Sequence, residues 1–212
     1  MAKKYKRREE KQKQRPSKPS ALRLFARQMD QWPLLECIIT EEWDQPSTLV
    51  QIAVVRKSPQ TGQVAVAGYL VDLGCLGVKN ALANIYPSEA VYQREYRDHL
   101  LRRQDFTTCD LNLAAKVIDT AVAYAASLGF KPHRDMRDAD LIRGAAQPEL
   151  CAEEVPVGDE DGKPFFIAGP YDNPTRIMRI LDRSVGPGNY HFLMPIGDPF
   201  MDDEDEDEDD EM

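Results

Sequence analysis

Two β-rich stretches lie next to each other between residues 48 and 73, and they constrain the fold of this chain more than any other feature. Residues 48–56 (TLVQIAVVR) and 63–73 (QVAVAGYLVDL) are rich in apolar and β-branched residues, and SPQTG between them has the composition of a turn. This pattern predicts a β-hairpin. The second stretch is apolar on both faces around residues 69–71, which is typical of a central strand covered on both sides. Helices elsewhere in the chain must therefore cover this hairpin.

The longest predicted helix is rich in alanine and starts near Thr107 or Thr108. Its apolar positions follow the 3.6-residue period as far as Leu128, and Gly129 is placed to end it. Asn173 predicts the N-cap of another helix, through Arg183, with Pro174 in its first turn. Further helices are predicted at residues 21–29, 88–104 and 137–145.

A second hairpin is predicted where residues 154–157 and 163–168 flank the acidic turn DEDG. Residues 190–196 predict a last strand. The expected fold is therefore α+β: a single domain with two β-hairpins, an Ala-rich central helix and flanking helices.

The two ends of the chain carry opposite charge. Residues 1–20 hold nine of the 27 Lys and Arg residues and two of the acids, whereas residues 198–212 hold 11 of the 36 Asp and Glu residues and no base. Like charges repel and such segments bury little, so both ends are predicted to be disordered. The sequence thus predicts a basic arm (1–20), a globular α+β domain (21–197) and an acidic tail (198–212).

Several classes of protein are disfavoured by composition. No apolar run approaches the length of a membrane helix, and no apolar stretch follows the basic start as in a secretory signal. The four cysteines are far apart and form no CxxC pair, which favours free thiols in a reducing cytoplasm over a disulfide framework or a zinc site. We therefore expect a cytoplasmic protein with no membrane contact, and the sequence leaves its oligomeric state open.

Asp72 is the first candidate site residue, because it lies in an otherwise apolar strand. With Asp135, Asp138 or Asp140 it could hold Mg²⁺, since clustered carboxylates are the ligands of such sites. In the alternative, Asp72 ends the strand and accepts hydrogen bonds from backbone N–H groups or pairs with Lys79.

His133 and Asp135 form the second candidate, an acid/base pair in the loop that follows the long helix. Cys109 or Cys75 could serve as a nucleophile beside His133. The alternative is that these well-spaced thiols are core residues.

Three blocks of sequence resemble an uncharacterised family of bacterial cytoplasmic proteins. They are LVDLGCLGVKNA (70–81), YAASLGFKPHRD (124–135) and DGKPFFIAGPYD (161–172), which share the patterns LVDxxCLGVK, YAxxLGFxPHxD and DGKPxxxxGP. The resemblance implies a soluble bacterial protein. It assigns no catalytic residue and no role to any position.

The function expected from these features is a non-catalytic interaction module that contacts RNA, DNA, the ribosome or an acidic protein through its basic arm and needs no cofactor. The acidic tail could compete with phosphate for that arm. The residues expected to bind are Lys3, Lys4, Lys6, Arg7, Arg8, Lys11, Lys13 and Arg15. The alternatives are a metal-dependent hydrolase or nuclease that uses the clustered aspartates with Mg²⁺, and a toxin, defence or regulatory component recognised by a protein partner.

Overall fold

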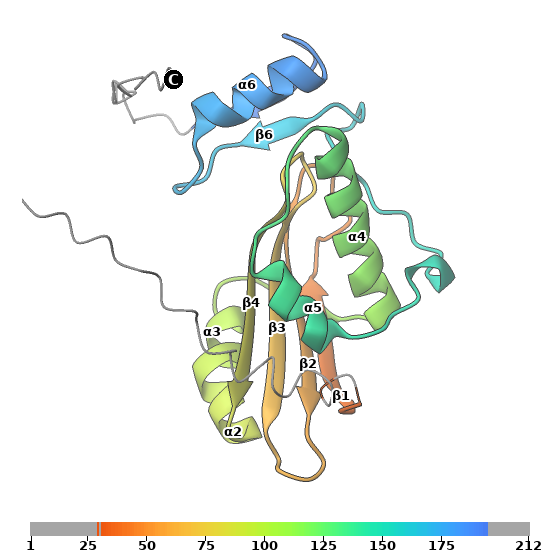
Figure 1. The fold of residues 1–212 in the computed structure, drawn as a ribbon, viewed down its shortest axis with the longest axis vertical. Helices are drawn as coiled ribbons and strands as arrows, with labels where there is room; N and C mark the ends of the chain where they lie inside the picture. The colour runs from red at the N-terminus through yellow and green to blue at the C-terminus, as the bar shows by residue number, and fades with distance from the viewer. Residues whose placement is uncertain (1–28, 30, 195–212) are drawn as a thin grey trace, which may run out of the picture.

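The computed structural model describes residue 29 and residues 31–194, which are built around a five-stranded antiparallel sheet (Figure 1). A short strand, β5, pairs with β1, so the order across the sheet is β4-β3-β2-β1-β5. The mixed α+β class predicted from the sequence is confirmed. The basic arm, the acidic tail and all but Met29 of the predicted helix 21–29 lie outside the described residues. The five strands are β1 (Leu34–Thr40), β2 (Leu49–Lys57), β3 (Val64–Asp72), β4 (Gly77–Tyr86) and β5 (Phe106–Thr108).

The predicted hairpin is confirmed as β2 and β3, which pair along their full length. Its turn is closed by hydrogen bonds from Ser58 N to Gln63 O at 2.8 Å and from Gly62 N to Ser58 O at 3.0 Å. Gly62 has a φ of 73°, a conformation that glycine adopts without strain. Eight of the nine residues of β3 are buried, as expected for a strand covered on both faces.

The helices α4 (Leu111–Ser127) and α5 (Met136–Arg143) cover one face of the sheet (Figure 1). The contact between α4 and β4 is close because small residues meet there: a Cβ added to Gly77 of β4 would lie 2.8 Å from the Cβ of Ala125 in α4. The largest core cluster fills this layer with residues of all four long strands and both helices, among them Ile39, Ile52, Val54, Tyr69, Val78, Ile118 and Ile142.

A continuous helical segment covers part of the other face, and it matches the helix predicted at 88–104. It consists of α2 (Glu89–Tyr92), the π-helical turn η1 (Gln93–Arg97) and α3 (Asp98–Leu101). Ser88 caps its N-terminus, because the Ser88 hydroxyl accepts a hydrogen bond from Val91 N.

The predicted Ala-rich helix is confirmed as α4, but it begins later than expected. Thr107 and Thr108 belong to β5, and the side chain of Asp110 caps the helix by accepting a hydrogen bond from Asn112 N at 2.7 Å. At the other end Gly129 has a φ of 93°, and Phe130 N donates to Ala125 O at 2.9 Å. This hydrogen bond closes a Schellman motif, so the end of the helix lies where the sequence predicted it.

The C-terminal segment, defined here as residues 163–194, forms a small β-α-β unit at one end of the molecule (Figure 1). Two strands, β6 (Phe165–Ile167) and β7 (His191–Leu193), are parallel and are connected through α6 (Pro174–Ser184). The predicted N-cap of α6 is confirmed, since Asn173 Oδ1 accepts a hydrogen bond from Arg176 N at 2.9 Å. Cys75, Leu76, Leu128, Phe166, Leu181 and Tyr190 pack this unit against the sheet and α4.

The prediction of a second hairpin was wrong. Residues 154–157 form no strand, and β6 pairs with β7 rather than with them. The physical reason lies in Gly158 and Asp159. Gly158 N donates to Leu73 O at 2.8 Å, which holds this stretch at the end of β3, while the Asp159 carboxylate closes a tight loop by accepting hydrogen bonds from Asp161 N and Lys163 N.

Candidate functional site

The three sequence blocks at residues 70–81, 124–135 and 161–172 meet where the sheet joins the C-terminal segment. His133 N of the second block donates to Val78 O of the first at 2.8 Å. Phe165 N of the third block donates to Gly74 O of the first at 3.0 Å. The approach is so close that a Cβ on Gly74 would lie 2.2 Å from Phe165 O. The three blocks therefore build a structural junction.

Asp72 lies at this junction and caps the turn between β3 and β4. Its Oδ1 accepts hydrogen bonds from Cys75 N at 2.9 Å and Leu76 N at 3.2 Å. Burial raises the pKa of this carboxyl, and the two backbone hydrogen bonds oppose that rise. This is the strand-end role that the sequence offered as the alternative to a metal site.

Lys79 pairs with Asp172 rather than with Asp72. The Lys79 Nζ to Asp172 Oδ2 distance is 2.6 Å, and the two side chains are only 16% and 13% exposed. The same carboxylate oxygen accepts a hydrogen bond from Gly169 N at 2.8 Å. Because Lys79 lies on β4 and Asp172 precedes α6, this pair ties the C-terminal segment to the sheet.

His133 and Asp135 lie together in the loop before α5, as predicted, but their contact is loose. Asp135 N donates to His133 Nδ1 at 3.3 Å, and the Asp135 carboxylate lies 3.9 Å from the same nitrogen. The structure records no contact of the two candidate nucleophiles, Cys109 and Cys75, with His133 among the described residues. Cys109 Sγ instead lies 3.5 Å from Cys37 Sγ, and Cys75 is completely buried. Burial raises the pKa of Cys75, so its thiol stays protonated.

Among residues 29 and 31–194, no group of three or more His, Cys, Asp or Glu side chains is arranged to hold a metal ion. Asp72, Asp135 and Asp138 are therefore not gathered into one such group. Asp140, the other acid considered for that site, belongs to a different network. Its Oδ1 accepts a hydrogen bond from the Tyr69 hydroxyl at 3.1 Å and lies 3.3 Å from Arg143 Nε.

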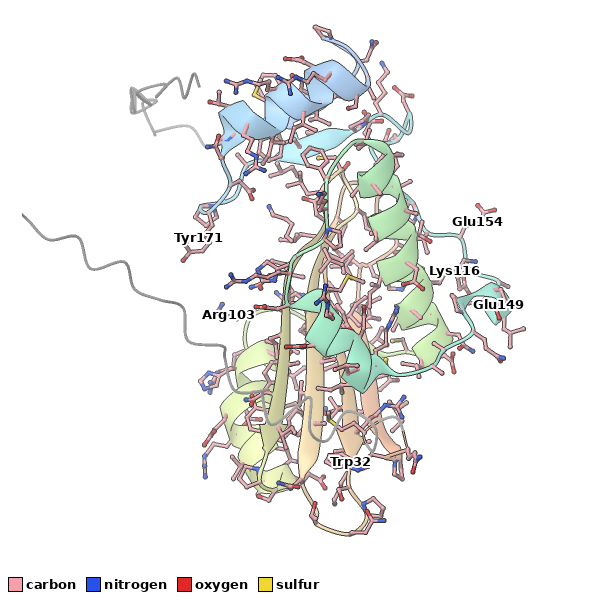
Figure 2. All side chains as sticks on the ribbon, viewed as in Figure 1. Trp32, Arg103, Lys116, Glu149, Glu154 and Tyr171 are labelled. Atoms are coloured by element: carbon pink, nitrogen blue, oxygen red, sulfur yellow. The ribbon has the colours of Figure 1, made fainter. Side chains whose placement is uncertain are left out.

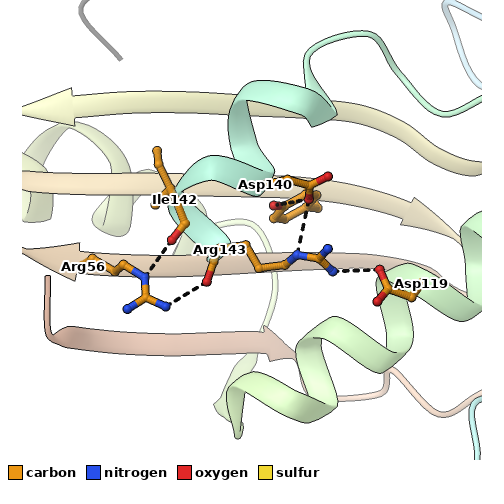
Figure 3. A network of polar contacts seen from close by, with 6 residues as sticks. Arg56, Asp119, Asp140, Ile142 and Arg143 are labelled. Carbon is orange, nitrogen blue, oxygen red and sulfur yellow. Dashed lines mark hydrogen bonds and ion pairs between the residues drawn. The ribbon is translucent and has the colours of Figure 1, made fainter. Parts of the chain in front are cut away.

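That network positions α5 on the sheet (Figure 3). Arg56, a buried residue of β2, donates to the last carbonyls of α5: Nε to Ile142 O at 2.7 Å and one terminal nitrogen to Arg143 O at 2.8 Å. Arg143 in turn donates to Asp119 of α4 at 2.8 Å. Burial raises the pKa of Tyr69, so its phenol stays protonated, and burial also raises the pKa of Asp140. The role of these polar side chains is therefore structural: they hold α5 against the sheet and α4.

Open hollows of about 390 and 490 Å³ lie on the described surface. The larger one contains a pair that the sequence analysis missed, because His191 Nδ1 lies 2.7 Å from Asp159 Oδ2. Ser47 also lines it, but the Ser47 hydroxyl donates to Gly158 O at 2.9 Å. A carboxylate that orients a histidine can support proton transfer, but the Ser47 hydroxyl is bonded to a backbone carbonyl rather than to His191. No sequence signal links residues 159 and 191, which meet through the parallel pairing of β6 and β7.

The exposed face of α6 carries a row of three arginines. Arg176, Arg179 and Arg183 follow helical spacing and are all exposed, while Leu181 on the opposite face is buried. None of the three forms an ion pair with an acid within the part of the chain that the structure describes. Tyr171, just before the helix, is 99% exposed and projects away from the molecule (Figure 2).

Comparison with known proteins gave no match: no family model, no curated protein and no solved structure resembles the chain significantly. None of the helices in the described residues is long and apolar enough to span a membrane.

Proposed function

We propose that this protein is a non-catalytic module that binds single-stranded nucleic acid. The observation that carries the proposal is the separation of charge: nine cations gather in residues 1–20, three arginines lie on one face of α6, and eleven acids gather in residues 198–212. Such a set of cations can neutralise phosphates and release their counterions, which gives binding that depends on salt more than on sequence.

The α6 arginine face, defined as Arg176, Arg179 and Arg183, supports a nucleic-acid ligand in particular. Guanidinium groups bind phosphate through paired hydrogen bonds. Tyr171 adds an exposed aromatic ring next to the same helix, and stacking of bases on such rings is what favours single strands over duplexes. Cations together with an aromatic ring at one end of the molecule fit a nucleic acid better than an acidic protein.

The acidic tail follows the C-terminal segment along the chain, so it is tethered to the unit that carries the α6 arginine face. A tethered segment has a high effective concentration at neighbouring sites. We propose that the tail competes with nucleic acid for the cations of the protein. The proposal also places the protein in a reducing cytoplasm, and the four free thiols are in keeping with that compartment.

The test is fluorescence anisotropy of a labelled oligouridine with the full chain at low and at physiological salt. Removing residues 2–20 should weaken binding at least about tenfold and flatten the salt dependence. Changing the α6 arginine face to glutamine should weaken binding by about three- to tenfold, and Tyr171→Ala by about fivefold, because phosphate contacts and base stacking are lost. Removing residues 198–212 should tighten binding.

The matched control for the α6 arginine face is the triple change of Arg94, Arg102 and Arg103 to glutamine, which removes the same charge from the helical segment α2–α3 and the turn that follows it. This control should change affinity less than the α6 variant does. Equal weakening by both triple variants would show that only net charge matters. An affinity that does not respond to salt or to removal of residues 2–20 would overturn the proposal, and tight binding of an acidic protein instead of oligouridine would change the class of ligand.

A further inference from the structure

Cys37 and Cys109 face each other across the edge of the five-stranded sheet. Cys37 lies in β1, and Cys109 directly follows β5, the strand that pairs with β1. Cys109 N donates to Cys37 O at 3.0 Å, and the two sulfur atoms are 3.5 Å apart. Directly opposed residues of an antiparallel pair have Cα atoms about 4.5–5.5 Å apart, a separation that a disulfide can span. Both thiols are free.

The two thiols differ in access to solvent. Cys37 is 3% exposed and belongs to the main core cluster, whereas Cys109 is partly exposed. An oxidant in solution can therefore reach Cys109 first. Cys37 is placed behind it, within contact distance, as a second thiol that can attack the oxidised sulfur.

The surroundings of Cys109 favour its thiolate. The hydrogen bond from the Cys37 thiol lowers the pKa of Cys109, while burial and the neighbouring Asp110 carboxylate oppose that change. Cys109 also lies one residue before Asp110, the N-cap of α4, where the positive end of the helix dipole favours an anion. The pKa of Cys37 is raised by the same hydrogen bond, by burial, and by the charges of Cys109 and Asp110, against a smaller opposing effect of Arg56. Cys37 thus remains the proton donor.

We propose that Cys109 and Cys37 form a redox site that reacts with hydroperoxides. The Cys109 thiolate attacks one peroxide oxygen, the O–O bond breaks, and the leaving alkoxide takes a proton to give an alcohol, or water when the oxidant is hydrogen peroxide. Cys109 becomes a sulfenic acid. The Cys37 sulfur then attacks the Cys109 sulfur, its proton leaves with the hydroxide as water, and an intramolecular disulfide forms. Two electrons pass from the two sulfur atoms to the peroxide.

The disulfide would tie β5 and the start of α4 to β1. β5 has only three residues and lies at the edge of the sheet, so a covalent bond there adds a constraint that the reduced protein lacks. The linked residues are 72 positions apart in the chain. Closing a loop of that size should raise the melting temperature by roughly 10 °C, reversibly on reduction.

The test uses the full chain, reduced, freed of reductant and treated with a small molar excess of hydrogen peroxide. Intact mass should show the loss of two hydrogen atoms per chain, and peptide mapping should link Cys37 to Cys109. Cys37→Ser should stop at a sulfenic acid on Cys109 that dimedone traps. Cys109→Ser should form neither product. The matched control, with Cys75 and Cys151 both changed to serine, should form the disulfide as the wild type does.

Three results would overturn the proposal: a disulfide that involves Cys151, a linkage between two chains, or equal oxidation of the Cys109→Ser variant. The melting temperature of the oxidised wild type provides a second measurement that needs no variant. If mapping finds the bond but the melting temperature falls, the constraint described above is absent and the sulfur atoms have met only through local unfolding.

Discussion

In the five-stranded sheet, β3 buries eight of its nine residues, whereas in the C-terminal segment all three residues of β7 are exposed. The sheet carries two apolar clusters, one on each face, with long pairings between consecutive strands. The C-terminal segment has two three-residue strands and one small cluster, and a largely buried ion pair ties it to β4. Burial on this scale stabilises the sheet globally, while the smaller segment depends on a few directed contacts. The segment should therefore open before the sheet does.

The largest effect should come from the core beneath α4. Ile118→Ala removes a completely buried side chain from the main cluster and should lower the free energy of unfolding by about 2–5 kcal/mol. Chemical denaturation followed by circular dichroism measures this loss. Ser127→Ala, at an exposed position of the same helix, should change stability by no more than about 0.5 kcal/mol. A small loss for Ile118→Ala would mean that the sheet is not the globally stabilised part.

A smaller effect is expected at the link between the two regions. Asp172→Asn leaves Lys79 largely buried without its counter-ion and should cost about 1–3 kcal/mol. The loss should appear as faster hydrogen exchange at Ala168, whose N–H donates to Leu193 O, with little change in β2 and β3. The control is Glu89→Gln, because the Lys57–Glu89 pair is 41% and 37% exposed and should contribute about 0.5 kcal/mol or less. Faster exchange throughout the sheet would contradict the comparison.

The smallest effect is expected in acid. Although desolvation opposes ionisation, the hydrogen bonds from Lys163 N and Asp161 N and the charge of His191 lower the pKa of Asp159. A carboxyl whose pKa is lowered in the folded state contributes stability above its unfolded pKa, near 4, and that contribution is lost as pH falls through the lower folded value. The loop at residues 159–163 should thus loosen below about pH 4. Amide exchange at Asp161 and Lys163 measures this, and Asp159→Asn should abolish the pH dependence.

Sequence patterns predicted the parts of the fold that are encoded locally. The β2–β3 hairpin has a short turn between two apolar runs, α4 has the helical period and a glycine at its end, and α6 has Asn173 and Pro174 at its start. β4 was missed because Lys79, Asn80 and Asn84 interrupt its apolar pattern at positions on the edge of the sheet. β1 was also missed, although it pairs with β2, the next strand along the chain. β5 was missed because it has only three residues and its pairing with β1 joins segments far apart in the chain.

The candidate sites were harder to predict for the same reason. Asp72 was correctly chosen as unusual, but its partners are two backbone N–H groups that any sequence could supply. The pairs Lys79–Asp172, Asp159–His191 and Cys37–Cys109 each join residues from different elements. Such pairs depend on strand order and on the parallel pairing of β6 with β7, which local pattern does not encode.

Arg56 has a consequence for the order of folding. Its guanidinium donates to Trp32 O before β1 and to Ile142 O and Arg143 O at the end of α5, so one side chain joins three stretches of chain. A guanidinium gives up water at high cost until all of its acceptors are in place. The central hairpin can form early through local contacts, but the burial of Arg56 must wait for the arrival of α5. Docking of that helix and closure of the core around this cation should therefore be one late, cooperative event.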